Sequence, residues 1–350
     1  MTWDELDWPA LDRLRERFLH GPGTSGPYWQ TQQDLANYDL TYGERIGWKW
    51  DHVLRELRLR GWRPRSRNVF DWGCGSGIAS RRVISFFGAH EFDTLTVWDH
   101  SALAADFAED SARREFSTLS VAQATESLLA ADTSIGLLIL SHVLNELAPG
   151  VLDRVGQLIA RSEAVLWVEP GTHDVSRQLG RIRDELRGRF QIVAPCTHEL
   201  GCPMFAPGNE RHWCHFFAPP PSEIFADSNW VKFGHRAGID LRSLPYCFVA
   251  ADLPTNDTRK TVNATDAGGT PAIPGGGLSR VIGRVEHFKP YARMLNCDAT
   301  GLTELELPKR ADPALFKQLE RTRAPLVYRW RRDGRKILGG DAGTDANPAH

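Results

Sequence analysis

A glycine-rich segment, Asp71-Trp-Gly-Cys-Gly-Ser-Gly77, constrains the fold of this 350-residue chain more than any other stretch. It follows a short strand predicted at residues 68–71 and opens a helix predicted to extend to about residue 87. Its three glycines let the backbone turn tightly and approach a ligand closely. The segment lacks the Lys-Ser/Thr pair of a P-loop, and Ile78 stands where a dinucleotide fingerprint would place its last glycine. The sequence therefore predicts a nucleotide-type pocket whose ligand is neither a triphosphate nor a dinucleotide.

Predicted strands and helices alternate through the middle of the chain. Strands are predicted at residues 95–99, which end in an acid, and at the apolar runs 135–140 and 164–168; the run at 135–140 is apolar enough for a central parallel strand. Helical segments separate these runs, and helical periodicity also covers residues 4–19 and 48–59. The alternation predicts an α/β fold with a doubly wound parallel sheet, whose ligand binds at the carboxyl ends of the strands.

Length, composition and charge exclude several classes of protein. The length suggests about two domains, and 41% hydrophobic with 25% charged residues excludes a disordered or fibrous chain. The formal net charge of −2 confines any nucleic-acid contact to local patches. No apolar run approaches the ~18 residues that span a bilayer, and the N-terminus lacks the features of a signal or transit peptide. We therefore expect no membrane partner and a cytoplasmic location.

The glycine loop resembles the first motif of class I methyltransferases that depend on S-adenosylmethionine (SAM). This resemblance implies a Rossmann-like domain in which an acid near the loop suits the ammonium group of SAM. Asp99 ends the next predicted strand, 22 residues after Gly77, and a carboxylate there suits the two ribose hydroxyls. The alternative is a structural turn that has lost its ligand. The cofactor-binding residues implied by the resemblance are Asp71, Gly73, Gly75, Gly77, Asp99 and Ser141.

The turn after the strand at 135–140 is a second candidate site. In class I methyltransferases this position faces cofactor and substrate, so His142 and Glu146 are candidate general bases. The alternative is a strand-to-helix turn in which Ser141 caps a helix and Glu146 lies in its first turns. The sequence does not assign the catalytic residue.

Three of the six cysteines lie in one segment rich in proline and histidine. Cys196, Cys202 and Cys214 have the spacing C-x5-C-x11-C, which is neither the C-x2-C of a zinc knuckle nor the C-x3-C-x2-C of radical SAM enzymes. In a reducing compartment this clustering favours a soft metal or an iron–sulfur cluster over disulfides. The alternative is a set of buried structural cysteines. The candidates for a fourth ligand are His198, His212, His215, Cys247 and Cys297.

Further motifs make the chain similar to a known family, the methyltransferase-like proteins of the ribosomal small subunit, of the mitochondrial Rsm-twenty-two type, and their bacterial relatives. The resemblance extends over about residues 35–335. The pieces that carry it are the glycine loop, Ser141-His-Val-Leu-Asn-Glu-Leu147, Glu169-Pro-Gly-Thr172, the cysteine-rich segment, and Ser279-Arg-Val281 leading to Cys297-Asp298.

The family resemblance implies a [4Fe–4S] cluster on four cysteines, with zinc as the alternative metal. The implied ligands are Cys196, Cys202, Cys214 and Cys297. Cys247 is left out, because the family usually shows an apolar residue at that strand position. The chain departs from the family pattern at Cys74, where a small residue is usual, and in a long insertion at 252–277, which is expected to be mobile.

The resemblance also implies a partner, the small ribosomal subunit or its RNA. Residues 309–336 contain ten Lys/Arg against three Asp/Glu, and Tyr328 and Trp330 interleave with arginines, which predicts stacking on bases beside phosphate contacts. The alternative is a solvated helix end that covers the sheet. A run of six arginines between residues 55 and 67, Arg60 among them, is either a solvated helix end and linker or a phosphate-contacting strip.

Four regions are predicted in total. They are an N-terminal helical region (1–65), a SAM-binding domain (66–192), a cysteine-rich iron–sulfur and β subdomain (193–308), and a basic C-terminal segment (309–350) with a disordered tail from residue 339. The first functional hypothesis is a SAM-binding, iron–sulfur protein that acts on small-subunit ribosomal RNA or on its assembly, with methylation of that RNA as the expected reaction, and that is monomeric away from the ribosome. The alternatives are a non-catalytic assembly factor with SAM as a structural ligand, and a small-molecule methyltransferase with a zinc site.

Overall fold

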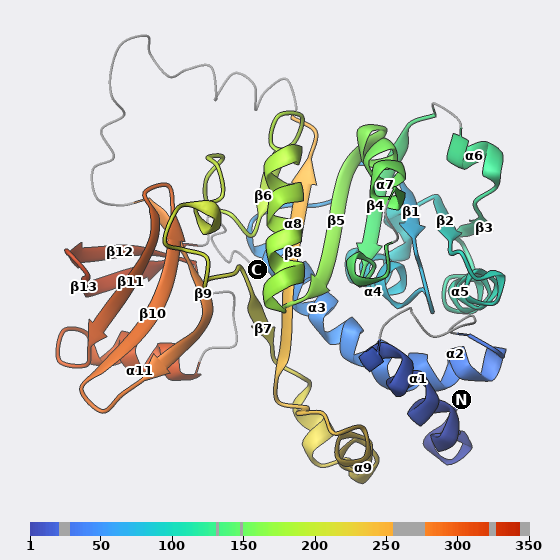
Figure 1. Cartoon of the computed structure of the whole chain (residues 1–350), viewed down its shortest axis with the longest axis horizontal. Helices are drawn as coiled ribbons and strands as arrows, with labels where there is room; N and C mark the ends of the chain where they lie inside the picture. Colours follow the sequence, from blue (N-terminus) through green and yellow to red (C-terminus); the bar gives the residue numbers. More distant parts are fainter. Residues whose placement is uncertain (21–28, 131–132, 148–149, 255–276, 322–326, 344–350) are drawn as a thin grey trace. The chain divides into compact units, whose positions relative to one another are not determined.

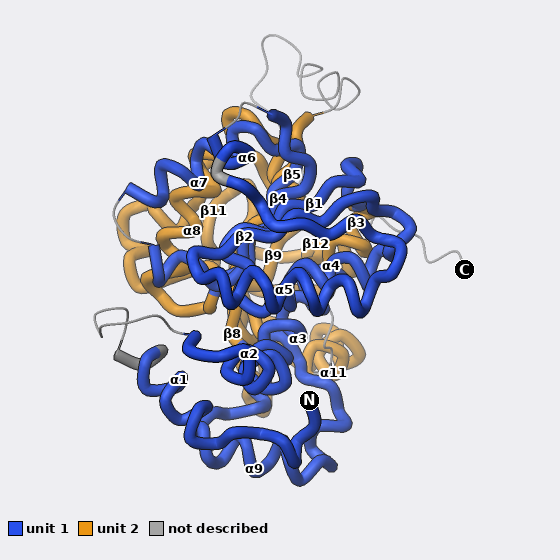
Figure 2. Tube along the Cα trace, turned by 90° about the vertical axis from the view of Figure 1, so that its right-hand side faces the viewer, with its two compact units in different colours: residues 1–54, 63–169, 218–244 blue, residues 55–62, 170–217, 245–350 orange. Residues whose placement is uncertain are grey.

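The computed structural model of the chain describes residues 1–20, 29–130, 133–147, 150–254, 277–321 and 327–343. The chain forms two compact units (Figure 2). Unit 1 comprises residues 1–54, 63–169 and 218–244, and unit 2 comprises residues 55–62, 170–217 and 245–350. Each unit is assembled from separate stretches of the chain. The predicted division into four consecutive regions, with boundaries at residues 65, 192 and 308, stays a prediction.

Unit 1 is built on a parallel sheet with the strand order β3-β2-β1-β4-β5 (Figure 1). The chain moves outward from β1 through β2 to β3 and then returns to β4 beside β1, so the switch point lies between β1 and β4. This arrangement confirms the predicted doubly wound α/β sheet. The strands are β1 (Asn68–Trp72), β2 (Thr94–Trp98), β3 (Ser120–Gln123), β4 (Ile135–Ser141) and β5 (Ser162–Pro170).

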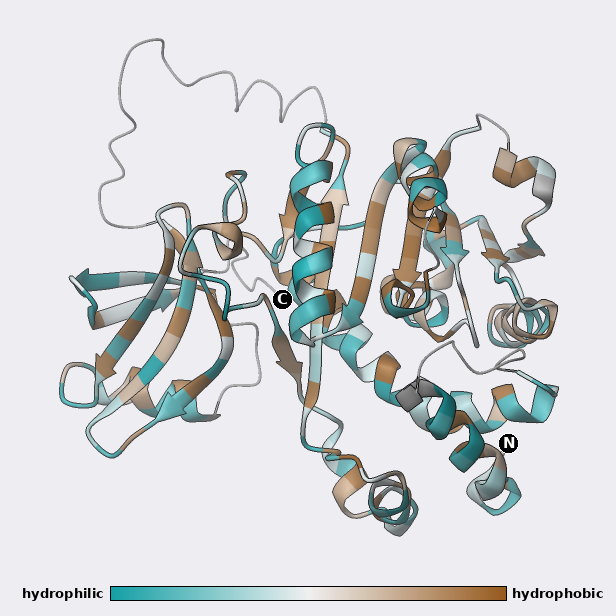
Figure 3. Ribbon diagram, in the orientation of Figure 1, coloured by the Kyte–Doolittle hydropathy of each residue, from teal (hydrophilic) through white to brown (hydrophobic). Residues whose placement is uncertain are grey.

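The central strands are buried because their sequences are almost wholly apolar. The first six residues of β4 are buried, and Figure 3 shows β4 and β5 as mostly hydrophobic along their length. Helices and short 3-10 turns connect the strands: α4 (Ile78–Phe87), η3 (Ala89–Glu91), α5 (Ala102–Glu115), α6 (Glu126–Ala130), η4 (Leu144–Glu146) and α7 (Val151–Ala160).

Helices from both ends of unit 1 share an aromatic cluster. Trp230 of α9 packs against Trp3, with ring centroids 5.1 Å apart, and against Trp48 at 4.7 Å. The predicted helices at 4–19 and 48–59 correspond to α1 and α3. The elements are η1 (Trp3–Glu5), α1 (Trp8–His20), α2 (Gln32–Tyr38), the π-helical turn η2 (Asp39–Gly43), α3 (Glu44–Leu59), η6 (Ser222–Phe225) and α9 (Ser228–Ala237).

Unit 2 contains a helix and a small group of paired strands. β8 pairs with β6 in antiparallel register and also pairs with β7. The cysteine-rich segment lies between β6 and β7 and has little regular structure, as its composition predicts. The elements are α8 (His173–Leu186), β6 (Gln191–Ala194), η5 (Pro203–Phe205), β7 (Phe216–Ala218) and β8 (Leu244–Asp252).

The last part of unit 2 is a closed five-stranded barrel with the order β10-β11-β13-β12-β9. All neighbouring strands are antiparallel except β11 and β13, which are parallel and meet at Glu306 and Lys336. Five strands closed in this Greek-key order, with a helix between the third and fourth, form the OB fold. The elements are β9 (Leu278–His287), β10 (Tyr291–Asp298), β11 (Gly301–Pro308), α11 (Pro313–Arg321), β12 (Val327–Asp333) and β13 (Lys336–Ala342).

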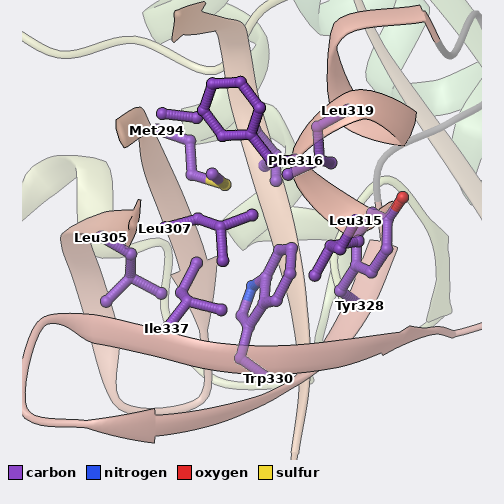
Figure 4. Close-up of a cluster of buried hydrophobic side chains, with 11 residues drawn as sticks. Met294, Leu305, Leu307, Leu315, Phe316, Leu319, Tyr328, Trp330 and Ile337 are labelled. Carbon is purple, nitrogen blue, oxygen red and sulfur yellow. The ribbon is translucent and has the colours of Figure 1, made fainter. Parts of the chain in front are cut away.

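The barrel core corrects two expectations about the C-terminal segment. Figure 4 shows Tyr328 and Trp330 inside the cluster formed with residues of β10, β11, β13 and α11. Their rings stack on each other at 4.4 Å, and Nε1 of Trp330 donates to Asn296 at 2.8 Å. The prediction that these two rings stack on RNA bases is therefore wrong. The predicted tail from residue 339 is also wrong over 339–342, which belong to β13.

Two expectations concern residues that the structure does not describe. Most of the predicted insertion, residues 255–276, and the end of the predicted tail, residues 344–350, lie outside the described residues. In the part of the chain that is described, no helix has the length and apolar character needed to cross a membrane.

Candidate functional site

The glycine loop connects β1 to α4 in unit 1. Gly73, Gly75 and Gly77 have positive φ angles of 68°, 54° and 75°, which L side chains rarely adopt. A Cβ at residue 73 would lie 2.7 Å from Cγ1 of Val143, so close packing requires glycine there. A Cβ at residue 75 would meet no described atom within 4 Å. The loop thus presents its backbone to open space at residue 75, as a ligand cradle requires.

Asp71 lies at the start of this loop and is completely buried. Its Oδ2 accepts a hydrogen bond from the Ser80 hydroxyl at 2.6 Å, whereas Oδ1 has no hydrogen-bond partner among the described residues. Burial raises the pKa of Asp71 to about 6. The role of Asp71 toward a cofactor stays a prediction.

Asp99 follows β2, and its carboxylate holds the glycine loop. Oδ2 accepts a hydrogen bond from the Gly75 N–H at 2.9 Å, and Oδ1 accepts one from the Ser101 N–H at 2.9 Å. Nδ1 of His100 lies 3.1 Å from the same Oδ1. The structure therefore brings two predicted cofactor residues, Asp99 and Gly75, into direct contact at the carboxyl ends of β2 and β1.

Ser141 ends β4, and its hydroxyl accepts a hydrogen bond from Nε1 of Trp50 at 2.9 Å. The alternative in which Ser141 caps the next helix is wrong, because η4 begins at Leu144 and its N-cap is Val143. Trp50 comes from α3, so the end of β4 is tied to a helix far away in sequence. Whether Ser141 contacts a cofactor stays a prediction.

His142 and Glu146, the two candidate bases, have opposite pKa shifts. Burial and the nearby charges of Lys49 and Arg45 hold the pKa of His142 well below its usual value. Its Nε2 lies 3.4 Å from Nζ of Lys49. Removal from water, with the Asp99 carboxylate nearby, raises the pKa of Glu146 to about 7. Since a general base works best when its pKa is close to the working pH, Glu146 suits proton transfer better than His142.

Glu169, at the end of β5, was not singled out as a site residue. It is fully buried, and its Oε1 accepts hydrogen bonds from the N–H groups of Val143 at 2.9 Å and Leu144 at 3.1 Å and from Nε1 of Trp167 at 2.7 Å. This carboxylate, and not Ser141, therefore satisfies the free N–H groups at the start of η4. The only sequence signal was its place at the end of a predicted strand, in the Glu-Pro-Gly-Thr piece.

The pKa of Glu169 gives a testable pH dependence. Burial raises this pKa to about 7 from an ordinary value of 4.5. The folded chain therefore binds the proton more tightly than the unfolded chain, and the resulting stabilisation is complete below about pH 4.5 and is lost as the pH rises through about 7. The unfolding free energy of the parent should therefore decrease between these pH values. In Glu169→Gln we expect this decrease to be smaller by on the order of 1–3 kcal/mol.

Urea unfolding of unit 1 across this pH range measures the effect. Glu163→Gln, on the same strand but partly exposed, is the matched control and should keep the slope of the parent protein. An unchanged slope in Glu169→Gln would show that Glu169 does not gain a proton in this range.

The residues around the loop fit a bound SAM. Three buried polar atoms in this part of unit 1 have no hydrogen-bond partner within the described residues: Oδ1 of Asp71, the Ser76 hydroxyl and Oε2 of Glu169. Buried polar atoms normally have partners. Together with the open space beside Gly75, these atoms are the features of this loop that fit a polar ligand at the switch point of the sheet.

The four predicted metal ligands all belong to unit 2 and are free thiols. Burial raises the pKa of Cys214 well above its usual value, and the nearby thiols of Cys196, Cys202, Cys297 and Cys247 add to that shift. Burial and the nearby Cys196 also raise the pKa of Cys202, to about 11, and burial with Cys196 and Cys202 raises that of Cys297. Cys297 of β10, which is buried, thus lies near the other three cysteines, which are half-buried.

The thiol and imidazole groups of this region are of the kind that binds a soft metal, but they are not close enough together to bind one ion. Sγ of Cys297 lies 3.8 Å from Nε2 of His198. Within the described residues, no three His, Cys, Asp or Glu side chains form a group that could hold a metal ion. The identity of any metal, and the ligand set, therefore stay predictions.

Two arginines hold the cysteine-rich segment by its backbone. Arg183 is 2% exposed and donates to the carbonyls of Leu200 at 2.6 Å and His198 at 2.9 Å. Arg60 donates to the carbonyls of Cys196 at 3.1 Å and Pro195 at 2.9 Å. Arg60 therefore has a structural role inside unit 2, which corrects both interpretations of the arginine run for this residue.

Comparison with known proteins gives one family and several solved structures. Residues 51–220 match the model of the family described as mitochondrial small ribosomal subunit Rsm22. The family predicted from the sequence motifs is therefore confirmed over this range. No curated protein matches the sequence.

The solved structures that resemble the chain include several methyltransferases. Magnesium protoporphyrin IX methyltransferase from Synechocystis, with bound S-adenosylhomocysteine, is 15% identical and has a TM-score of 0.38, and the match covers 72% of this chain and 97% of that one. Ribosomal protein L11 methylase from Lactobacillus delbrueckii is 25% identical and has a TM-score of 0.30, with coverages of 40% and 68%. TrmK from M. capricolum, in complex with S-adenosylhomocysteine, is 6% identical and has a TM-score of 0.32, with coverages of 57% and 68%.

Proposed function

We propose, from the membership of residues 51–220 in the Rsm22 family of the small ribosomal subunit, that this chain is a SAM-dependent methyltransferase acting on small-subunit ribosomal RNA. The observation that carries the proposal is the glycine loop with an open side at Gly75, held by Asp99 and surrounded by unpartnered buried polar atoms. A cytoplasmic or mitochondrial ribosome fits the proposal equally well.

The backbone of residues 73–77 and the Asp99 carboxylate would hold SAM, which supplies a methyl group already activated as a sulfonium. Asp99 keeps the loop open by accepting from the Gly75 N–H, and its carboxylate has the chemistry to accept from the ribose hydroxyls. Glu146, with a pKa raised to about 7, would accept the proton from the methylated group. Positioning supplies the remaining rate enhancement, because the methyl donor needs no further activation.

Asp99→Ala tests the cofactor pocket. We expect it to weaken SAM binding by about 10- to 100-fold, because hydrogen bonds to a charged group contribute about 1.5–3 kcal/mol. Equilibrium binding of SAM and transfer of a labelled methyl group to small-subunit particles lacking the modification are the measurements. Asp93→Ala is the matched control, since Asp93 precedes β2 at its other end and is exposed in a pair with Arg67.

The outcomes separate the functional hypotheses. Methyl transfer to the particles that is lost in Asp99→Ala supports the methyltransferase. SAM binding without transfer supports the non-catalytic assembly factor instead. Failure of the parent protein to bind SAM would reject both.

We propose as a second function that unit 2 holds a structural metal centre, a [4Fe–4S] cluster or alternatively zinc, on Cys196, Cys202, Cys214 and Cys297. The support is the position of buried Cys297, whose Sγ lies 3.8 Å from Nε2 of His198 in the cysteine-rich segment, and the mutual influence of Cys297 and the three half-buried thiols on their pKa values. Metal binding displaces the thiol protons, so a cation would remove the cost of burying four thiolates. The thiols would have to move closer together than they are in this structure, since no described group has the spacing of metal ligands.

A further inference from the structure

The β9–β10 turn, the β12–β13 turn and the last residues of β11 lie together at one end of the OB barrel. The β9–β10 turn contains residues 288–290, and the Lys309 N–H, just after β11, donates to the Pro290 carbonyl at 2.9 Å. The β12–β13 turn joins the same end, because the Glu306 N–H of β11 donates to the Arg335 carbonyl at 2.9 Å. We call this region the loop-end surface; it contains Phe288, Lys289, Tyr291, Lys309, Arg335 and Lys336.

The loop-end surface is positively charged in a chain whose formal net charge is −2. The three stretches that form it, 286–293, 306–310 and 332–336, contain seven Lys/Arg against three Asp/Glu. Lys289, Lys309, Arg335 and Lys336 are all exposed. Arg293 is paired with Glu286 at 2.6 Å, so the cations at the turns carry most of the excess charge.

An aromatic pair, exposed Phe288 and half-buried Tyr291, lies among these cations. Phe288 and Tyr291 stack with ring centroids 4.8 Å apart and an interplanar angle of 24°. Phe288 is 39% exposed, although it is a large apolar side chain at the tip of a turn. The guanidinium of Arg293 lies 5.3 Å from the Phe288 ring centroid. Neither ring belongs to the barrel core, so packing does not explain them.

Strands β10 and β11 are less suited to an anionic ligand than the turns are. Arg293 of β10 pairs across the sheet with Glu306, and Leu295 pairs with Glu304. At the other end of β10, Cys297 belongs to the cysteine region. Acidic side chains and the cysteine region therefore occupy much of β10 and β11, whereas the turns are cationic and aromatic.

We infer that the loop-end surface binds single-stranded RNA, with phosphates on the cations at the turns and a base stacked on the Phe288–Tyr291 pair. The inference rests on the proposed action on small-subunit RNA and names where that RNA is held. In OB folds, the turn between the first and second strands and the turn between the fourth and fifth strands contact oligonucleotides. Cationic grooves with aromatic platforms are the usual arrangement for single strands.

The experiment measures the affinity of the full chain for a labelled oligouridine of ~12 nucleotides by fluorescence anisotropy, at several salt concentrations. We expect Phe288→Ala to weaken binding about 5- to 100-fold, as loss of one stacked base does. We expect the triple variant Lys289→Ala, Arg335→Ala and Lys336→Ala to make the slope of log affinity against log salt shallower by about 2. All four side chains are exposed, so folding should be preserved.

Arg189→Ala is the matched control, because Arg189 is also an exposed cation beside an aromatic ring, that of Phe190 at 5.7 Å, but belongs to another part of unit 2. It should bind as the parent does. Unchanged affinity in Phe288→Ala and in the triple variant overturns the inference. Equal competition by polyglutamate and by RNA also overturns it, because the surface would then accept any polyanion.

The experiments can reject the RNA-binding inference and the proposed methyltransferase activity independently of each other. The variants of the loop-end surface should bind SAM like the parent protein. Loss of RNA binding in a protein that never binds SAM would support the RNA surface and reject the methyltransferase. Full methyl transfer to small-subunit particles by Phe288→Ala and the triple variant would support the enzyme and reject the RNA surface.

Discussion

Replacing Glu56 by alanine is expected to destabilise unit 2 by about 3–5 kcal/mol, the usual result when one partner of a buried ion pair is removed. Glu56 is 1% exposed and Arg280 of β9 is 3% exposed, and Nη1 of Arg280 donates to Oε1 of Glu56 at 2.6 Å. Arg60 donates to the same Oε1 at 2.8 and 3.1 Å. Without the carboxylate, the buried Arg280 guanidinium and the half-buried Arg60 guanidinium would both lose their counter-charge.

The loss of stability should arise because the Glu56–Arg280 pair is buried, and an exposed Glu–Arg pair should not show it. Glu286→Ala is the matched control, because Glu286 also lies on β9 and pairs with an arginine, Arg293, but at an exposed site. That variant should lose less than about 1 kcal/mol. Urea unfolding combined with hydrogen exchange of β9 peptides measures both variants. Equal losses in the two would contradict the argument.

A double variant refines the same prediction. Glu56→Met with Arg280→Met removes both charges and keeps the side-chain volume, so it should recover much of the stability lost in Glu56→Ala. The Arg280 guanidinium lies 4.1 Å from the Phe216 ring centroid, and an apolar methionine can keep that packing. A double variant as unstable as Glu56→Ala would show that Glu56 acts through something other than the charge of Arg280.

The sequence predicted the parallel sheet well, because local patterns determine it. The apolar run at 135–140 can only be a buried strand or a buried helix, and the glycine loop after residues 68–71 requires a strand-to-helix turn. Both features depend on neighbours in the chain.

Features that depend on distant contacts were missed. Tyr328 and Trp330 alternate with arginines, a pattern that fits a half-buried strand as well as a stacking platform, and only closure of the barrel places both rings inside. Glu169 and Arg60 look like ordinary surface residues in the sequence. Their roles come from N–H groups and carbonyls that other segments bring to them, and no spacing rule records such contacts.

The cysteine cluster could be predicted in part from local sequence and depends in part on distant contacts. The segment that holds Cys196, Cys202 and Cys214 could be recognised from its spacing, but the fourth member had several candidates. Cys297 enters the region because β10 pairs with β9, opposite Arg280, in the part of the barrel that adjoins the Glu56 ion pair. Long-range strand pairing, and not the cysteine spacing, brings Cys297 there, and its role as a ligand stays a prediction.

The second large effect is expected when Cys297 is replaced by serine. Serine keeps the volume but not the thiolate, so a metal centre with four cysteine ligands would lose one ligand and much of its binding free energy. Because metal binding in such a site is folding free energy, the loaded protein should lose several kcal/mol of stability, out of the ~10–16 kcal/mol known for structural zinc sites. In the metal-free protein, Cys297→Ser and the parent should be about equally stable.

Cys247→Ala is the matched control. Cys247 is buried, and its charge also affects the pKa of Cys214, but its Sγ lies 3.5 Å from the Pro170 carbonyl and it is not one of the four proposed ligands. It should keep the metal content of the parent. Loss of metal in this variant would replace Cys297 by Cys247 as the fourth ligand, provided that Cys297→Ser keeps the metal.

Metal analysis of protein purified without oxygen decides the remaining question. About four irons per chain with broad absorbance near ~400 nm supports the [4Fe–4S] cluster, and stoichiometric zinc without iron supports the alternative. Arg183 and Arg60 would then hold the cysteine-rich segment in place around the centre, so its backbone should exchange hydrogens slowly in loaded protein and faster after chelation. A parent protein with neither metal, and with equal stability before and after chelation, would reject the metal centre.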